Sequence, residues 1–254
     1  INNALIPTLR ALDGAPGVVI EVINEPEWCM ASACNTKQCV KDEEMKRFVA
    51  MIAGAVHSSS PFAVTVGSAS LKWSTNLTGG GQADFWNDAA LTAAYPAAGA
   101  AGTLDFYNVH YYDWMYNPSW GYDPCRKPAA YWGVDKPMVV AEMPADSTHY
   151  PADKLLSCAT EQGFVGGLFW AVNDPSHPLG AGLQAIKDFS AAHPADSYAA
   201  LVSWLKKLRS AISAISSLPR ASVASDVSAA SVASVAAGAA AGSAAAGSAA
   251  AGSA

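Results

Sequence analysis

Five short, mostly apolar runs recur along the chain, each four to six residues long. They cover residues 18–23, 62–67, 104–109, 138–141 and 167–172. Near-continuous apolar runs of this length are typical of parallel strands that are buried on both faces of a sheet. The pattern therefore predicts five strands of a parallel sheet.

Segments between these runs carry apolar side chains at helical spacing. In residues 41–57 the apolar positions are Met45, Phe48, Val49, Ile52 and Val56. Residues 151–162 and 195–215 are further helix candidates. Strand–helix alternation indicates βα units. A (β/α)8 barrel and an open doubly wound sheet both fit this order, but no glycine-rich phosphate-binding loop follows any of the runs.

The C-terminal end of the chain differs sharply in composition from the rest. Of the 34 residues 221–254, 17 are Ala, 8 are Ser and 4 are Gly, and residues 239–253 read AAAGS three times. Such a segment cannot bury a core, and Gly and Ser at every repeat weaken a helix. We therefore expect one folded domain over residues 1–220 and a low-complexity tail over residues 221–254.

The charge balance argues against nucleic-acid binding. The chain has 15 Lys+Arg against 21 Asp+Glu, which gives a net charge of −6, whereas such a protein needs a basic face. No apolar stretch reaches the roughly 20 residues of a membrane span, so we expect a soluble protein. The chain starts at Ile1 without a signal peptide, and we expect an N-terminal piece to be missing from the sequence.

Five cysteines are too few for a disulfide scaffold. Cys29, Cys34 and Cys39 are spaced C-x4-C-x4-C, and no histidine lies near them, which argues against a zinc site. One disulfide within this trio and spare thiols elsewhere is the preferred interpretation. Asn76 begins a glycosylation sequon, which is consistent with a secreted, extracellular protein.

Polar and aromatic residues follow the apolar runs where the strands are expected to end. Glu25 comes two residues after the first run, behind Asn24, and Glu142 directly follows the fourth. In a barrel the carboxyl ends of the strands meet at one face, so we expect both carboxylates to share a pocket. Two carboxylates in different environments, one protonated and one ionised, are what glycosidic-bond cleavage requires. Nearby tryptophans and tyrosines offer flat apolar faces for sugar rings.

Four motifs resemble those of clan A glycoside hydrolases, especially family 5, which contains cellulases and mannanases. The Asn-Glu-Pro motif is residues 22–26, the His-x-Tyr motif is residues 107–112, the segment before the nucleophile is residues 136–142, and the last-strand motif is residues 167–170. The resemblance implies that Glu25 is the acid/base, that Asn24 binds the sugar 2-hydroxyl and that Glu142 is the nucleophile. It also implies that Trp170 forms the floor of the −1 sugar-binding site.

The resemblance implies a retaining β-glycosidase that acts by double displacement, without metal or organic cofactor, on β-linked glucan or mannan. We expect His110 and Tyr112 to contact the substrate or the nucleophile. We expect the flanking tryptophans to bind substrate, namely Trp28, Trp73 and Trp114. For Trp73 and Trp114, loop packing remains open as the alternative. We interpret Glu27 as a loop residue. The other candidates are expected to face solvent, namely His149, His177 and His193. As general acid, Glu25 must keep its proton near neutral pH, so its pKa is expected to be raised.

The same resemblance numbers the five runs as strands 4 to 8 of a barrel, with residues 1–12 as the helix before strand 4. We therefore expect an incomplete TIM (β/α)8 barrel of the α/β class that lacks strands 1–3. Bare sheet edges predict self-association and weak hydrolysis. A non-catalytic carbohydrate-binding protein or fragment remains the alternative. We expect neither a nucleic-acid nor a membrane partner.

Overall fold

The computed structural model describes residues 1–193, except for 16, 35–37, 84 and 118–119. The helix predicted over residues 195–215 and the tail predicted from residue 221 lie outside these described residues. The domain boundary proposed near residue 220 therefore stays a prediction.

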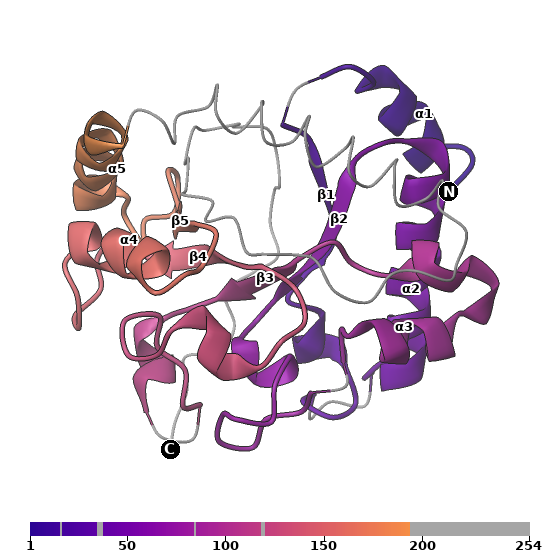
Figure 1. The fold of residues 1–254 in the computed structure, drawn as a ribbon, viewed down its shortest axis with the longest axis horizontal. Helices are drawn as coiled ribbons and strands as arrows, with labels where there is room; N and C mark the ends of the chain where they lie inside the picture. The colour runs from indigo at the N-terminus through magenta and orange to yellow at the C-terminus, as the bar shows by residue number, and fades with distance from the viewer. Residues whose placement is uncertain (16, 35–37, 84, 118–119, 194–254) are drawn as a thin grey trace.

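Five parallel strands form a single sheet in the order β1-β2-β3-β4-β5. Their bounds are β1 Val19–Asn24, β2 Ala63–Ser68, β3 Tyr107–His110, β4 Met138–Pro144 and β5 Gly167–Trp170. Each strand overlaps one of the apolar runs. The sheet curls from β1 to β5 as half of a barrel wall (Figure 1). The α/β class and the open, curved five-stranded sheet predicted from the sequence are confirmed.

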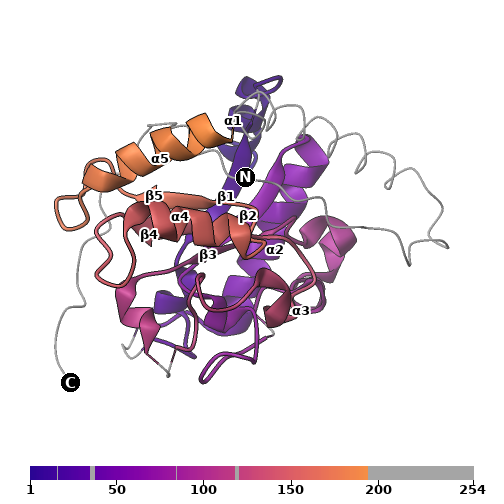
Figure 2. The ribbon, with the colours of Figure 1, turned by 60° about the vertical axis from the view of Figure 1, so that its left-hand side comes forward.

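The helices lie on the outer side of the curved sheet. Their bounds are α1 Leu5–Ala11, α2 Asp42–Ser59, α3 Asp88–Ala94, α4 Ala152–Glu161 and α5 Gly180–Ala192. Helices α1, α2 and α3 accompany β1 and β2, while α4 and α5 accompany β4 and β5 (Figure 2). Short 3-10 turns occupy several loops, namely η1 Pro26–Cys29, η2 Leu71–Trp73, η3 Pro96–Gly102, η4 Asp113–Tyr116 and η5 Ala129–Trp132.

Helix α2 illustrates why the local sequence forms these elements. Its first turn holds Asp42, Glu43 and Glu44, whose charges favour the positive end of the helix dipole. Its buried face carries Val49 and Val56 against the sheet. The observed helix differs from the predicted one by one or two residues at each end, because terminal turns depend on capping rather than on periodicity.

The core lies between the sheet and its helices. Val64, Val109 and Val140, one from each central strand, are fully buried. The outer strands are less covered, since Val19 on β1 is 39% exposed and Leu168 on β5 is 40% exposed. These side chains therefore leave the two outer strands of the described sheet with apolar surface in contact with water.

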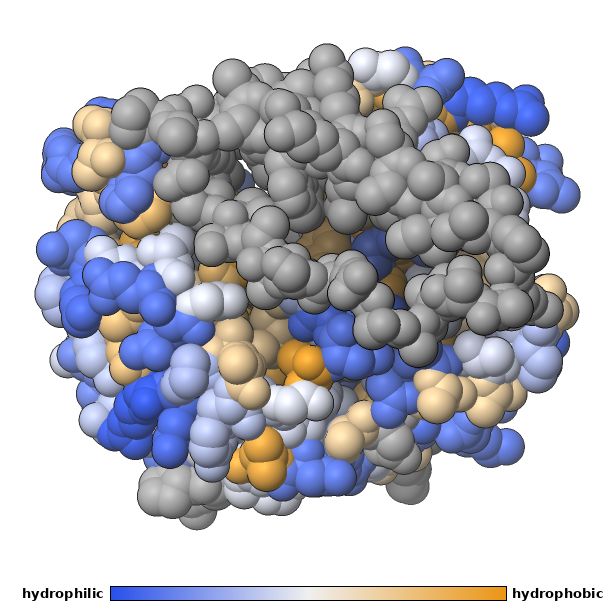
Figure 3. Space-filling model, viewed as in Figure 1, coloured by the Kyte–Doolittle hydropathy of each residue, from blue (hydrophilic) through white to orange (hydrophobic). Residues whose placement is uncertain are grey.

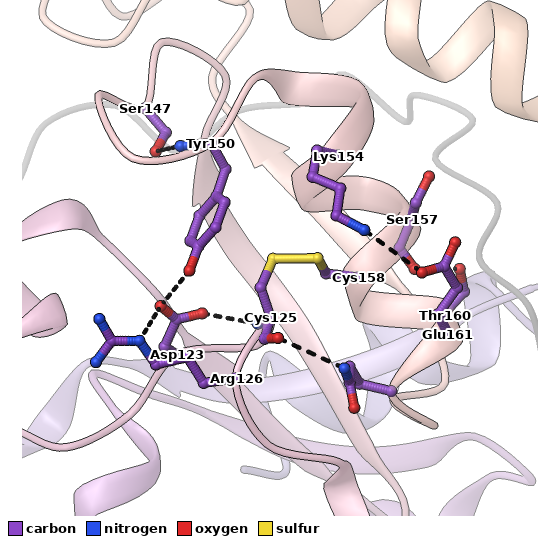
Figure 4. The surroundings of a disulfide bond; sticks show 11 residues. Asp123, Cys125, Arg126, Ser147, Tyr150, Lys154, Ser157, Cys158, Thr160 and Glu161 are labelled. Atoms are coloured by element: carbon purple, nitrogen blue, oxygen red, sulfur yellow. Dashed lines mark hydrogen bonds and ion pairs between the residues drawn. A yellow bond between two sulfur atoms is a disulfide. The ribbon is translucent and has the colours of Figure 1, made fainter.

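Two disulfides link the chain. Cys34–Cys39 confirms the bridge expected within the cysteine trio, and Cys29 is an exposed free thiol. The interpretation of the remaining cysteines as spare thiols is wrong, because Cys125 and Cys158 are bonded across 33 residues (Figure 4). This pairing joins the segment before η5 to α4, which only the packing of βα units brings together.

The outer surface agrees with this layering. Over α4 and α5, at the left of the view, hydrophilic residues predominate (Figure 3), while α4 turns Leu155 and Leu156 inward. Within the described part of the chain, no helix has the length and apolar character that a membrane crossing needs.

Candidate active site

Glu25 stands where β1 ends and the η1 turn begins. Its backbone is left-handed, with φ 45° and ψ 49°, and its N–H donates to the carbonyl of Gly67 on β2. The carboxylate accepts hydrogen bonds from His110 Nδ1 at 2.8 Å and from Trp28 Nε1 at 2.9 Å. The side chain is thus aimed at the end of β3 and held by two donors.

Glu142 comes from β4, which is separated from β1 by β2 and β3. The Tyr112 hydroxyl donates to its Oε2 at 2.7 Å, and His110 Nδ1 lies 3.4 Å from the same oxygen. The side chain of Asn24 also hydrogen-bonds this carboxylate. Three neighbours that the sequence had singled out therefore surround Glu142.

Glu25, His110 and Glu142 converge on one point. One ligand atom from each, an imidazole nitrogen and two carboxylate oxygens, lies within 4.8 Å of the other two. His110 is 1% exposed by its side chain, Glu142 11% and Glu25 26%. The structure thus brings the two carboxylates together at the carboxyl ends of the strands, with Glu25 nearer to solvent.

The protonation of the pair differs from the sequence-based expectation. Burial raises the pKa of Glu25, but the hydrogen bond and charge of His110 outweigh it and, with the Trp28 N–H, hold that pKa below its ordinary value. Burial raises the pKa of Glu142, and the nearby Glu25 charge adds to this, while His110 and Tyr112 oppose it. The expectation of a raised pKa for Glu25 is therefore wrong here, because His110 donates to Glu25 more closely than to Glu142.

His110 responds to both carboxylates. Burial would lower its pKa, but the hydrogen bond to Glu25 and the charges of Glu142 and Glu25 raise it above the ordinary value of 6.5. The imidazolium form offsets one of the two negative charges. The ring therefore lets the two carboxylates approach each other without full like-charge repulsion.

Gly67 allows β1 and β2 to meet closely under the site. A Cβ at this position would lie 2.7 Å from Asn24 Oδ1 and 2.8 Å from Glu21 Oε1. Both distances are below any ordinary contact, so a side chain here would push Asn24 away. Glycine at the end of β2 is thus a requirement of the geometry that holds Asn24 against Glu142.

Exposed indoles flank the pair on either side. Trp28 is 42% exposed and Trp114 46% exposed, and their ring centroids lie 6.2 Å apart, with Trp120 packed against both. On the far side, Trp170 is 38% exposed and donates its Nε1–H to Asp174 at 2.9 Å. Each of these three residues is therefore partly exposed to solvent.

Trp73 does not belong to this group. It is 3% exposed and stacks on Phe85 with centroids 5.3 Å apart and planes 15° from parallel. Of the two roles left open for it, the structure favours packing. Its expected role as a sugar platform is therefore corrected, because both faces lie inside the protein.

Two neighbours of the site have surroundings that the sequence did not indicate. Glu27 lies in the η1 turn, as its interpretation as a loop residue required, but it is completely buried and accepts three hydrogen bonds. His177, expected in solvent, is half-buried, with its ring centroid 5.3 Å from that of Tyr112 and its Nδ1 3.4 Å from Asp146. Neither lies in a motif that could have indicated it. The only signal for Glu27 in the sequence was the polar alternation itself, since Glu27 comes two residues after Glu25.

Comparisons with known proteins bear on what this arrangement belongs to. No protein-family model matches the chain. A mannan endo-1,4-beta-mannosidase of Mytilus edulis is 31% identical over 136 residues, which are 53% of this chain and 36% of that protein. The chain thus spans about one third of this curated relative.

Solved structures show the same likeness. The beta-mannanase of the blue mussel Mytilus edulis is 25% identical with a TM-score of 0.63, over 73% of this chain and 57% of that one. The beta-1,4-D-mannanase of Cryptopygus antarcticus is 23% identical with the same TM-score and coverage. The described half-barrel is therefore an incomplete TIM-like α/β fold, similar in sequence and structure to part of endo-β-1,4-mannanases.

Proposed function

We propose that the chain carries the catalytic pair of a retaining β-glycoside hydrolase that cleaves β-1,4-mannan. One observation carries the proposal: an oxygen of Glu25 and an oxygen of Glu142 lie within 4.8 Å of each other where two parallel strands end. Retaining enzymes need about 5–5.5 Å between their carboxyl groups, and inverting ones about 6.5–9.5 Å. The close approach supports double displacement.

In the proposed reaction, Glu142 attacks the anomeric carbon while Glu25 gives its proton to the departing glycosidic oxygen. This step leaves a glycosyl ester on Glu142. Glu25, now ionised, takes a proton from water as the water attacks the anomeric carbon and releases Glu142. The hydrogen bonds from Tyr112 and Asn24 orient the attacking carboxylate, and His110 orients Glu25.

The assignment of the two roles rests on the motif that contains Glu25. The pKa directions favour the opposite assignment, since the pKa of Glu142 is raised and that of Glu25 is lowered. Substrate would displace water from both carboxylates and change these environments. Identifying the residue that becomes covalently attached to the sugar decides between the two assignments.

Mannan is proposed as the substrate because the similar proteins are named mannanases. Trp28, Trp114 and Trp170 offer exposed ring faces on both sides of the carboxylates, as a chain of sugar rings requires. Secretion is proposed as well, since two disulfides are typical of proteins made in an oxidising compartment. Asn76, which begins the sequon, is exposed.

The test is covalent trapping with a 2-deoxy-2-fluoro-β-mannosyl fluoride, followed by peptide mass spectrometry. A single turnover suffices, so slow catalysis by the open sheet does not obscure the result. We expect one fluoromannosyl group on Glu142, and none after Glu142→Gln. Labelling of Glu25 would reverse the roles. Absence of labelling, together with absence of reducing ends from mannan, would contradict the proposal.

A further inference from the structure

Glu27 is the most completely buried carboxylate beside the site, yet the proposed reaction does not use it. It is 0% exposed. Its Oε1 accepts from Ser68 Oγ at 2.6 Å and from Trp86 Nε1 at 2.7 Å, and its Oε2 accepts from the Ala69 N–H at 3.1 Å. A carboxylate with this many donors is held in one geometry.

These donors connect the turn after β1 to the end of β2. Ser68 is the last residue of β2, and Ala69 follows it. On the N-terminal side of Pro26, the backbone N–H of Glu25 donates to the carbonyl of Gly67. The turn that carries Glu25 is therefore bonded both before and after Pro26 to three consecutive residues, two at the end of β2 and one directly after it.

Glu25 needs such fastening because its backbone is unfavourable. A left-handed conformation is unfavourable in a residue other than glycine and persists only where the surroundings enforce it. Glu25 has φ 45°, and Pro26, which follows it, drives the preceding residue toward extended conformations. Without an anchor beyond Pro26, the turn would relax and carry the Glu25 carboxylate away from His110 and Trp28.

We propose that Glu27 is a positioning residue whose buried carboxylate, bound by Ser68, Ala69 and Trp86, locks the turn that presents Glu25 to His110 and Trp28. Its importance for catalysis rests on the proposed function. The effect of Glu27 on the placement of Glu25 does not depend on that function, and it can be measured without turnover.

The Trp28 indole N–H reports directly on that placement, since it donates to Glu25 Oε2 at 2.9 Å. The charged groups that face Glu25 are Glu21 on β1, His110 on β3 and Glu142 on β4. In the unmodified protein, the Trp28 indole resonance in a 1H–15N NMR spectrum should move as this cluster titrates.

The test compares Glu27→Gln with Asp113→Asn. Asp113 is a matched control, because it also accepts three hydrogen bonds from a neighbouring loop, from Ser147 Oγ, Thr148 N and Thr148 Oγ1. Glutamine keeps the shape of Glu27 but presents an NH2 group to one of the three donors. We expect Glu27→Gln to move the Trp28 resonance and abolish its titration. The Trp86 resonance moves as well, because Trp86 Nε1 donates directly to residue 27, while the remaining indole resonances stay in place.

With mannan, Glu27→Gln should lower kcat about tenfold or more with little change in KM, and Asp113→Asn should change neither. An unchanged Trp28 titration in Glu27→Gln would overturn the inference. If Glu27→Gln does not fold, Trp86→Phe removes a single donor and should weaken the titration in the same direction. An unchanged titration there would overturn it equally. Loss of the titration in a chain that never hydrolyses mannan would support the positioning role while refuting the proposed function.

Discussion

The Cys125–Cys158 disulfide should contribute more to stability than Cys34–Cys39. It closes a loop with a sequence separation of 33, against 5 for the other bridge. A cross-link removes conformational freedom from the unfolded chain, and the effect grows with the logarithm of the loop length. The larger loop contains part of the segment between β3 and β4, the whole of β4 and most of α4. Its opening therefore frees most of one βα unit.

The expected magnitude follows from the two separations. The loop-entropy relation gives about 3.7 kcal/mol for the long loop and about 2.1 kcal/mol for the short one at 25 °C. The contacts around the long bridge do not depend on the sulfurs. Asp123 accepts from the Cys125 N–H at 2.7 Å and from the Tyr150 hydroxyl at 2.8 Å, and it pairs with Arg126 (Figure 4). Replacement by serine should therefore leave this network in place.

The assay is urea unfolding followed by tryptophan fluorescence, on the double variants Cys125→Ser/Cys158→Ser and Cys34→Ser/Cys39→Ser. We expect the first to lose about 1.7 kcal/mol more unfolding free energy than the second. The urea dependence must be compared as well, since a change in its slope would mean that the unfolded state had altered. Equal losses, or a larger loss for the short loop, would refute the loop-entropy argument for this protein.

Further predictions concern the site and the sheet edges. The pKa values of His57 and His110 are both raised, so their stabilisation is complete below about pH 6.5 and is lost as pH rises through the folded-state values; His57→Gln and His110→Gln should each flatten the fall of unfolding free energy above pH 6.5. Glu25→Gln should lower the pKa of Glu142, read by 13C NMR of its carboxyl carbon, because it removes a charge that raises that pKa; a rise would contradict the coupling. Gly67→Ala should cut kcat about 100-fold, since the new Cβ would displace the asparagine beside Glu142; unchanged kinetics would mean that the turn can yield. The 254-residue chain should self-associate through β1 and β5 in light scattering, and a monomer at all concentrations would exclude this.

The local sequence was enough to predict the sheet and the identity of the central carboxylates. Each of the strands β1 to β5 overlaps one of the five apolar runs, because a strand buried on both faces must be apolar throughout. Glu25 comes directly after β1, and Glu142 directly follows the fourth apolar run. Parallel strands bring their carboxyl ends to one edge. Helix α2 was predicted from the same kind of local information. The helices α3 and α5 were not, since their apolar periodicity is short or weak.

Tertiary structure decided how these residues act on one another. His110 lies closer to Glu25 than to Glu142, and this difference of less than an ångström sets which carboxylate has the lower pKa. Trp73 and Trp28 look alike in sequence, yet one is buried and one is exposed. The proposed anchor role of Glu27 depends on donors at the end of β2 and directly after it, 41 and 42 residues away. Apolar periodicity records burial within one segment, whereas hydrogen bonds, pKa shifts and long-range pairing depend on distances that arise only when separate segments pack together.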